Sequence, residues 1–358
     1  DFAAWLKHGG ANDSDSPHVK YAYTWGSSKS GRFLRTFLYY GFNADERGGQ
    51  VFDGVMAHIA GAARLSLNER SAIPNALSFF TATGFPYANQ STKDPITGRV
   101  EGVLENERAK AVQPKVFYTN TSVEYWGGGR SAALVHTSPD GSADLSLPAN
   151  ERVYFLTGAQ HSPARFPARV TQGQQAENPV EYAYTLRALL MAMDAWVRQG
   201  KTPPASQYPK LSDGTLVAAA QVKFPSIPGV QSPATLPAVR QEGKAIPYLV
   251  PQVDADGNDL AGIRTPEISV PVATYTGWNF RNQAIGGQNL LVALMGSSIP
   301  FAANAGAKTA GDPRKAVSER YPSQSAYLAA VQKAADGLVA GGYLLKEDVV
   351  HVTKRAED

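Results

Sequence analysis

A run of small residues near the start of the chain, Gly26-Ser27-Ser28-Lys29-Ser30, fits the small-x-nucleophile-x-small pattern of a strained turn between a strand and a helix. Such a turn exposes its central serine, here Ser28, for nucleophilic attack, and side chains two positions away must be small. Ser30 is the alternative nucleophile, although Arg32, two residues beyond it, is too bulky for the pattern. A serine that only caps the following helix is the structural alternative. A phosphate loop fits poorly, because the Gly-Lys-Ser/Thr ending is absent.

A serine nucleophile needs a base, and His161 is the best placed of the six histidines. It lies in Gly158-Ala159-Gln160-His161, directly after a predicted strand, where the carboxyl ends of parallel strands share one edge. His136, just ahead of a Pro-Asp-Gly turn, is the alternative base. For either histidine, a hydrogen-bonded structural role is the competing interpretation.

The base needs a carboxylate that fixes its tautomer, and Glu124 is the best candidate. It follows another predicted strand and lies 96 residues after Ser28 and 37 before His161, in the order serine, acid, histidine. Asp53 is the alternative acid, with a loop-fixing role more in keeping with its surroundings. The backbone N–H of Lys29 is expected to donate to the oxyanion that forms when Ser28 attacks a carbonyl.

These residues require a parallel sheet, and the sequence supplies short apolar runs for it. Strands are predicted at residues 19–25, 51–57, 115–121 and 152–157. Helical spacing predicts four helices. They lie at the first residues of the chain, directly after the Ser28 turn (the nucleophile elbow), from an Asn178 cap to Gly200, and over residues 325–340. A further strand-like run covers 268–276. The expected fold class is α/β.

The domain organisation is expected to be a core over residues 1–200, a lid insertion at about 62–112, and a C-terminal extension over 201–358 that packs on the core. The insertion is too long for a simple crossover and rich in aromatic residues. Four aromatic side chains are candidates to line a pocket for an apolar or aromatic acyl group, although core packing is their commoner role. They are Phe85, Tyr125, Trp126 and Trp278.

The composition of the 358 residues excludes several classes of protein. The net charge of +3 gives no nucleic-acid footprint or polybasic membrane patch, and no apolar run is long enough to span a bilayer. The absence of cysteine excludes disulfides, thiolate metal sites and cysteine catalysis. These counts do not determine the cellular compartment of the protein, although a periplasmic or secreted location is slightly favoured over a cytoplasmic one. Residues 254–259 space their oxygens like a calcium loop, but a polar turn fits better, so no metal or cofactor is predicted.

The motifs resemble those of the bacterial α/β-hydrolase-domain proteins related to serine esterases, whose elbow reads like Gly-x-Ser-Gln-Ser-Gly-Arg-Phe-Leu-Arg. Here Lys29 replaces the usual Gln, which changes the charge beside the nucleophile but keeps the backbone N–H. The resemblance continues through Asn43-Ala44-Asp45-Glu46-Arg47, Phe52-Asp53-Gly54-Val55-Met56, Ser122-Val123-Glu124-Tyr125-Trp126, Gly158-Ala159-Gln160-His161, Ala261-Gly262-Ile263-Arg264-Thr265-Pro266-Glu267 and Ala273-Thr274-Tyr275-Thr276-Gly277-Trp278-Asn279.

This resemblance implies an α/β-hydrolase fold, hydrolysis of a small-molecule carboxylic ester, and Ser28, Glu124 and His161 as the triad. An amidase or peptidase with the same triad, or a catalytically silent binding protein with this fold, are the alternatives.

The short N-terminal segment is the unusual feature of this interpretation. An α/β-hydrolase usually places several strands and an oxyanion loop ahead of the elbow, whereas 27 residues precede Ser28 here. The sheet would then be its C-terminal part, from the nucleophile strand onward, with that strand as an open edge. We therefore expect the N-terminal part of the same precursor to be a separate chain that pairs beside residues 19–25. Alternatively, later residues such as 268–276 fill the vacant position.

Overall fold

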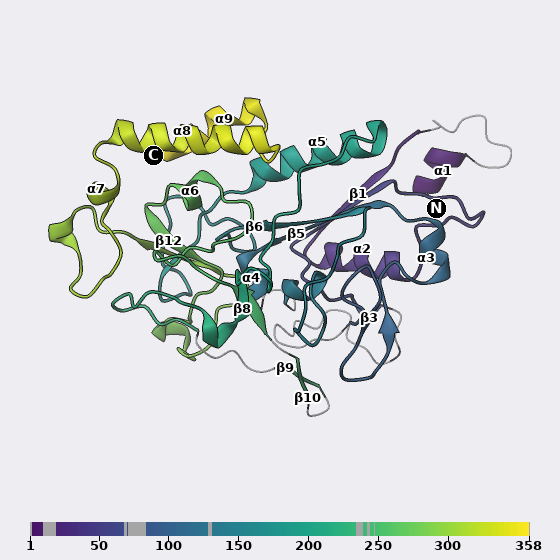
Figure 1. Ribbon diagram of the computed structural model, residues 1–358, viewed down its shortest axis with the longest axis horizontal. Helices are drawn as coiled ribbons and strands as arrows, with labels where there is room; N and C mark the ends of the chain where they lie inside the picture. The colour runs from purple at the N-terminus through teal and green to yellow at the C-terminus, as the bar shows by residue number, and fades with distance from the viewer. Residues whose placement is uncertain are drawn as a thin grey trace.

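A four-stranded parallel sheet in the order β1-β2-β5-β6 forms the centre of the computed structural model (Figure 1). Its strands are β1 (Tyr23–Ser27), β2 (Gly54–His58), β5 (Lys115–Thr121) and β6 (Glu151–Leu156). The structure describes residues 2–9, 19–67, 70, 84–127, 131–233, 239–241, 244–246 and 248–357. The four predicted strands are confirmed, and β1 and β2 begin later than expected. Residues ahead of them make loop contacts instead, such as those from Val19 N to Leu6 O and from Val51 N to Asn43 O.

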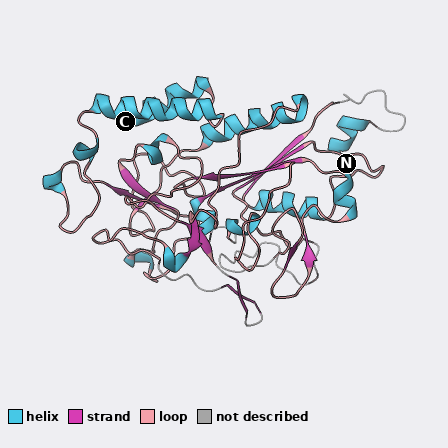
Figure 2. Ribbon diagram, viewed as in Figure 1, coloured by secondary structure: helices cyan, strands magenta, loops and turns pink. Residues whose placement is uncertain are grey.

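Both faces of this sheet are buried, which explains why its strands read as apolar runs. Val55, Val116 and Val153 pack on one face with α2 (Lys29–Tyr39). Met56, Phe117 and Tyr154 pack on the other face with α5 (Ala183–Gln199). Figure 2 shows helices on both sides of the central strands.

Helix α5 begins later than the sequence predicted. The expected cap, Asn178, lies ahead of the helix, and Tyr182 occupies the N-cap position. The Asn178 amide instead donates to the backbone oxygens of Gly158 and Thr276, which joins three distant segments. The predicted cap is therefore wrong, because tertiary hydrogen bonds use the side chain.

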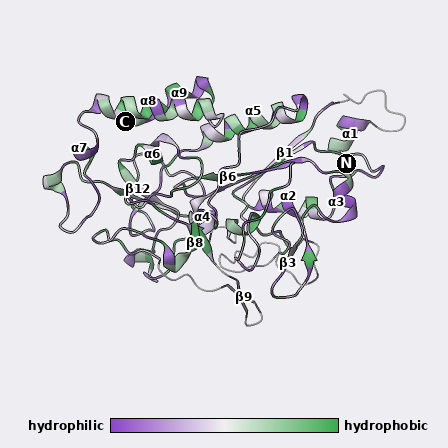
Figure 3. Cartoon of the chain, viewed as in Figure 1, coloured by the Kyte–Doolittle hydropathy of each residue, from purple (hydrophilic) through white to green (hydrophobic). Residues whose placement is uncertain are grey.

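The remaining elements include two helices that the sequence predicted: α1 (Phe2–His8) and α8 (Gln324–Gly341). In Figure 3, α5 and α8 carry both hydrophilic and hydrophobic residues, as helices with one face on the core do. The other helices are α3 (Glu107–Ala111), α4 (Ser122–Trp126), α6 (Pro266–Ser269), α7 (Val317–Arg320), α9 (Val349–Glu357), η1 (Ala132–Val135), η2 (Ala219–Gln221), η3 (Gln283–Ile285), η4 (Ala305–Ala307) and η5 (Lys346–Asp348).

Small antiparallel sheets surround the core. Their strands are β3 (Thr92–Lys93), β4 (Val100–Glu101), β7 (Ala176–Glu177), β8 (Leu216–Ala218), β9 (Val239–Gln241), β10 (Lys244–Ile246), β11 (Leu249–Pro251), β12 (Ala273–Thr276) and β13 (Ser297–Pro300). The run at 268–276 is divided between the end of α6 and strand β12, and β12 pairs with β13. Its proposed place beside the elbow strand is therefore wrong.

The two edges of the central sheet differ. Within the described residues β1 pairs with β2 alone, whereas the outer side of β6 forms bridges to Gln207 and Ile263. Pairing of β1 with a separate N-terminal chain stays a prediction, as does the division of the chain at residue 200.

The expected lid contains β3, β4 and α3, and its residues 68–69 and 71–83 lie outside the described residues. Its role as a lid stays a prediction. In the described part of the chain, no helix has the length and apolar character needed to cross a membrane.

Candidate active site

The turn between β1 and α2 has the geometry of a nucleophile elbow. Ser28 has φ 56° and ψ −116°, a left-handed conformation that few non-glycine residues adopt. A Cβ atom on Gly26 would lie 2.5 Å from the Ser30 oxygen, and one on Gly31 would lie 2.9 Å from the Gly26 oxygen. The strand and the helix therefore approach so closely that only glycine fits at these two positions.

The Ser28 hydroxyl is not used as a helix cap, although Ser28 occupies the N-cap position of α2. Its backbone N–H donates to His58 O at 2.8 Å, which ties the elbow to the end of β2. The capping interpretation of Ser28 is therefore wrong. Ser30 lies inside α2, one residue past its start, and so is not at the apex of the turn.

Lys29 is the first residue of α2, so its N–H precedes the hydrogen-bond ladder of the helix. An N–H at this position is suited to bind the negative charge of a ligand. Its role as an oxyanion donor stays a prediction.

Glu124 and His161 form a buried pair at the carboxyl ends of β5 and β6. Glu124 Oε1 lies 2.6 Å from His161 Nδ1, and the Glu124 side chain is fully buried. The other carboxylate oxygen accepts from Thr121 N at 2.8 Å as part of a capping box that begins α4. The carboxylate accepts from Nδ1–H, which leaves Nε2 as the nitrogen available to take a proton.

The loop that carries His161 is held by distant residues. Tyr182 Oη donates to His161 O at 2.6 Å. Gln160 Oε1 accepts from Asn178 N at 3.2 Å and from Gly296 N at 3.0 Å. These bonds hold the Gln160 side chain and the His161 carbonyl, so they anchor the loop that carries the imidazole.

The structure brings Glu124 into contact with His161, and it places Ser28 at the same edge of the sheet. Among the described residues, no hydrogen bond joins Ser28 to His161. The two residues are linked indirectly, because Ser28 N donates to His58 O and Tyr182 Oη donates to His161 O. The His58 and Tyr182 rings lie 5.3 Å apart, and His58 Nδ1 lies 2.8 Å from Thr119 Oγ1. Burial lowers the pKa of His58 to about 4, against a smaller opposing effect of Glu124, so this ring is neutral.

Asp259 is a buried carboxylate that no sequence motif connects to this site. Its Oδ2 accepts from Ser122 Oγ and, at 3.1 Å, from Gly158 N. Ser122 begins the helix that carries Glu124, and Gly158 precedes His161 by three residues. Asp259 therefore links the segment that carries Glu124 to the loop that carries His161. Burial raises the pKa of the Asp259 carboxyl to about 6.

The carboxylates of the 254–259 loop engage different protein partners. Asp254 pairs with Arg264 at 3.2 Å, and Asp256 pairs with Arg320. Asp259 instead accepts hydrogen bonds from Ser122 and Gly158, near Glu124 and His161. Within the described residues, no group of acidic or histidine side chains is arranged to hold a metal ion.

The two alternative triad residues lie elsewhere. Asp53 precedes β2 and pairs with Lys7 at 2.8 Å, while Ala22 N donates to it at 2.8 Å. This position is at the opposite end of the strands from Ser28, roughly 16 Å away at about 3.3 Å per residue. His136 is fully buried and bonds Tyr125 Oη through Nε2 at 2.8 Å. In the described part of the chain, neither residue is hydrogen-bonded to the acid–histidine pair.

The predicted pocket aromatics are all buried. Tyr125 packs against Phe155 in the core, and Phe85 packs edge-on against Tyr87. Trp126 and Trp278 lie edge to face at 6.3 Å and line a cavity of about 50 Å³. That space is far below the size of an ordinary ligand pocket. Contact of these four residues with a substrate stays a prediction.

A family model described as an alpha/beta hydrolase domain matches residues 1–354. The chain belongs to this family. The alpha/beta hydrolase domain thus covers nearly all of the chain, and it indicates a hydrolase. The parallel sheet, the elbow and the acid–histidine pair agree with that membership.

Two curated proteins match part of this alpha/beta hydrolase domain. They are the chaperone proteins NfaE and AfaB of Escherichia coli, each 31% identical over 94 residues. The matched region is 26% of this chain and 37% of each relative, so the chain spans little more than a third of their length. No solved structure matches the chain.

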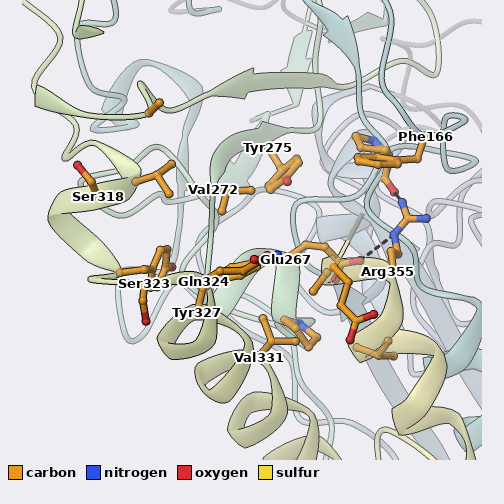
Figure 4. Close-up of a pocket in the computed structure, with 18 residues that line it drawn as sticks. Phe166, Glu267, Val272, Tyr275, Ser318, Ser323, Gln324, Tyr327, Val331 and Arg355 are labelled. Carbon is orange, nitrogen blue, oxygen red and sulfur yellow. Dashed lines mark hydrogen bonds and ion pairs between the residues drawn. The ribbon is translucent and has the colours of Figure 1, made fainter. Parts of the chain in front are cut away.

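A separate cavity of about 520 Å³ lies between the C-terminal helices and β12 (Figure 4). Tyr275, Tyr327 and Val331 line its wall, and Arg355 pairs with Glu267 at 3.4 Å beside it. None of the predicted triad residues lines this cavity.

Proposed function

We propose that this hydrolase cleaves carboxylic esters through an acyl-enzyme on Ser28. The observation that carries the proposal is the buried 2.6 Å pair of Glu124 and His161, at the same sheet edge as the strained serine. A serine at an elbow and a histidine oriented by a carboxylate are the parts that acyl transfer requires.

In the first half of the reaction, His161 Nε2 takes the proton of the Ser28 hydroxyl as Oγ forms a bond to the ester carbonyl carbon. The oxyanion that results is stabilised by the Lys29 N–H, a contribution of about 3 kcal/mol for one such donor. The intermediate then expels the alcohol, which takes the proton from His161. Glu124 stabilises the imidazolium and keeps its tautomer throughout.

In the second half, water replaces the alcohol. His161 takes a proton from water as the hydroxide oxygen bonds to the acyl carbon. The second tetrahedral intermediate releases the carboxylic acid and returns the proton to Ser28 Oγ. The residues present account for every proton in this cycle, so the proposal requires no cofactor.

Two other functions use the same fold. An amidase or peptidase would use the same residues on a poorer leaving group. A catalytically silent binding protein is the second, and it gains some support from the partial match to two chaperones. The Ser28 hydroxyl, which makes no capping hydrogen bond, and the His161–Glu124 pair favour an enzyme, because a binding surface needs neither.

A fluorophosphonate probe separates these functions. We expect wild-type protein to be labelled at Ser28, as located by peptide mass spectrometry, and to hydrolyse p-nitrophenyl esters in preference to the matching p-nitroanilides. Ser30→Ala is the matched control, since it removes a neighbouring hydroxyl, and it should still be labelled. Folded protein that neither reacts with the probe nor hydrolyses any ester would support the silent binding protein.

A further inference from the structure

Arg32 is a buried arginine in the first turn of the nucleophile helix, four residues after Ser28. Only 5% of it is exposed. Its backbone N–H donates to Ser28 O at 3.0 Å, and its backbone oxygen accepts from Thr36 Oγ1 at 3.0 Å. Among the residues that the structure describes, its guanidinium has no acceptor and no carboxylate partner.

The contacts around Arg32 place it at the catalytic edge of the sheet. A Cβ on the preceding residue, Gly31, would lie 2.9 Å from Ala60 Cβ and 3.1 Å from His58 O, so this turn packs on the end of β2. Thr36, one turn later on the same stripe, accepts from Leu65 N at 2.8 Å. Side chains of a helix lean toward its N-terminus, so the Arg32 side chain leans toward the turn that holds Ser28.

The charges around this turn are unbalanced. Lys29 and Arg32 are cationic, and the N-terminus of the 11-residue helix α2 adds partial positive charge. Burial lowers the pKa of the Arg32 guanidinium, and the charge of the Glu124 carboxylate opposes that effect in part. Glu124 is already hydrogen-bonded to His161 and Thr121, and the neighbouring His58 is neutral.

The Arg32 guanidinium has no acceptor among the described residues and its nitrogens are not sealed from solvent, so a ligand group can bind it. A carboxylate is the group that matches its planar fork of donors. We propose that Arg32 binds a carboxylate carried by the substrate, so that the preferred substrates are esters with a free carboxylate in the acyl chain. The acyl part is the expected location because it stays bonded to Ser28, beside this turn, through both halves of the reaction. This inference rests on the proposed esterase function.

The test compares two substrates of equal length: the mono-p-nitrophenyl ester of adipic acid, and the same compound with its free carboxylate capped as a methyl ester. The measured quantity is the ratio of kcat/KM for the charged over the neutral substrate. We expect wild type to favour the charged substrate, and Arg32→Gln to lower the ratio about 10- to 100-fold, as for loss of a hydrogen bond to a charged group. Arg32→Lys should fall between, because it keeps the charge but loses the fork.

Arg198→Gln is the matched control. Arg198 is more than half exposed at the end of α5, where it pairs with Asp194, so its removal should leave the ratio unchanged. Equal ratios in wild type and folded Arg32→Gln, or an equal loss of kcat/KM on both substrates, would overturn the assignment of Arg32 to carboxylate recognition.

A failure of the esterase proposal would look different. In that case wild type would hydrolyse neither substrate and would resist the fluorophosphonate probe. Titration calorimetry with adipate then tests Arg32 independently of turnover. Binding by wild type that is weakened in Arg32→Gln supports the anion site, and an unchanged or undetectable heat in both overturns it.

Discussion

Two buried histidines of this protein, His161 and His136, differ in ways that separate a reactive group from a structural one. Both are at most 9% exposed, and each makes one close side-chain hydrogen bond. His161 bonds a carboxylate and lies on a loop at the carboxyl edge of the sheet. His136 bonds the Tyr125 phenol in the core, where burial lowers its pKa to about 3. Burial is therefore common to both, and the partner and its position distinguish them.

The largest effect expected from this comparison concerns the base itself. His161→Gln should lower kcat about 10⁴-fold or more, because in the proposed mechanism the Ser28 proton passes to His161. Ser28→Ala should have a similar effect, and the double variant should lose little more, since the two residues act as one unit. The measurement is kcat on a p-nitrophenyl ester, with folding checked by circular dichroism.

His136→Gln is the matched control for that experiment, and its kcat should stay within a few-fold of wild type. Additive losses in the double variant would argue that Ser28 and His161 do not cooperate. A folded His136→Gln protein as inactive as His161→Gln would break the distinction between the two histidines.

The second effect concerns the carboxylate partner. Glu124→Gln should lower kcat about 10³-fold, because an amide neither fixes the His161 tautomer nor stabilises the imidazolium as a carboxylate does. Asp53→Asn is the matched change at the opposite end of the strands, and it should affect thermal stability through Lys7 rather than kcat. Activity near wild type in Glu124→Gln, with loss in Asp53→Asn, would transfer the role of the acid to Asp53.

A smaller effect is expected at Asp259, which links the Glu124 loop to the His161 loop. Asp259→Ala should lower kcat about tenfold with little change in KM, because misplacement of the acid–base pair affects the chemical step more than binding. Ser122→Ala removes one of the two donors to Asp259 and should have a weaker effect in the same direction. A rise in KM with unchanged kcat would show that the 254–259 loop acts on substrate binding instead.

The smallest effect is a pH dependence of stability that His136 should show. Burial lowers its pKa from the ordinary value of 6.5 to about 3, so the folded protein favours the neutral ring. The associated stability is fully present above pH 6.5 and is lost as the pH falls toward 3, by about 1.4 kcal/mol per pH unit over that window.

The measurement is the free energy of unfolding in urea at several pH values from 7 to 4. The difference between wild type and His136→Gln should shrink as the pH falls, because the variant has no ring to protonate. Parallel pH profiles for the two proteins would mean that His136 is protonated as easily in the folded state as in the unfolded one.

The sequence by itself determined the parts of this protein whose signals are local. The elbow follows from adjacent small residues, because Gly26 and Gly31 are the positions where strand and helix backbones meet. The four strands follow from apolar runs, because both faces of the sheet are buried. The pairing of Glu124 with His161 followed from chain order, since neighbouring parallel strands bring their carboxyl ends together.

Only the tertiary structure decided the features that depend on residues far apart in the chain. Asp259 lies 137 residues from Ser122 and 101 from Gly158, and its local sequence resembles a calcium loop. Asn178 has the sequence context of a helix cap, but its amide donates to distant backbone carbonyl groups, and α5 begins later. Arg32 is an ordinary helix residue by sequence, and only its burial and its lack of an acceptor within the described chain single it out. Local sequence patterns reflect backbone preference. The partners of these three side chains are instead determined by packing between segments far apart in the chain, and a local pattern carries no information about that packing.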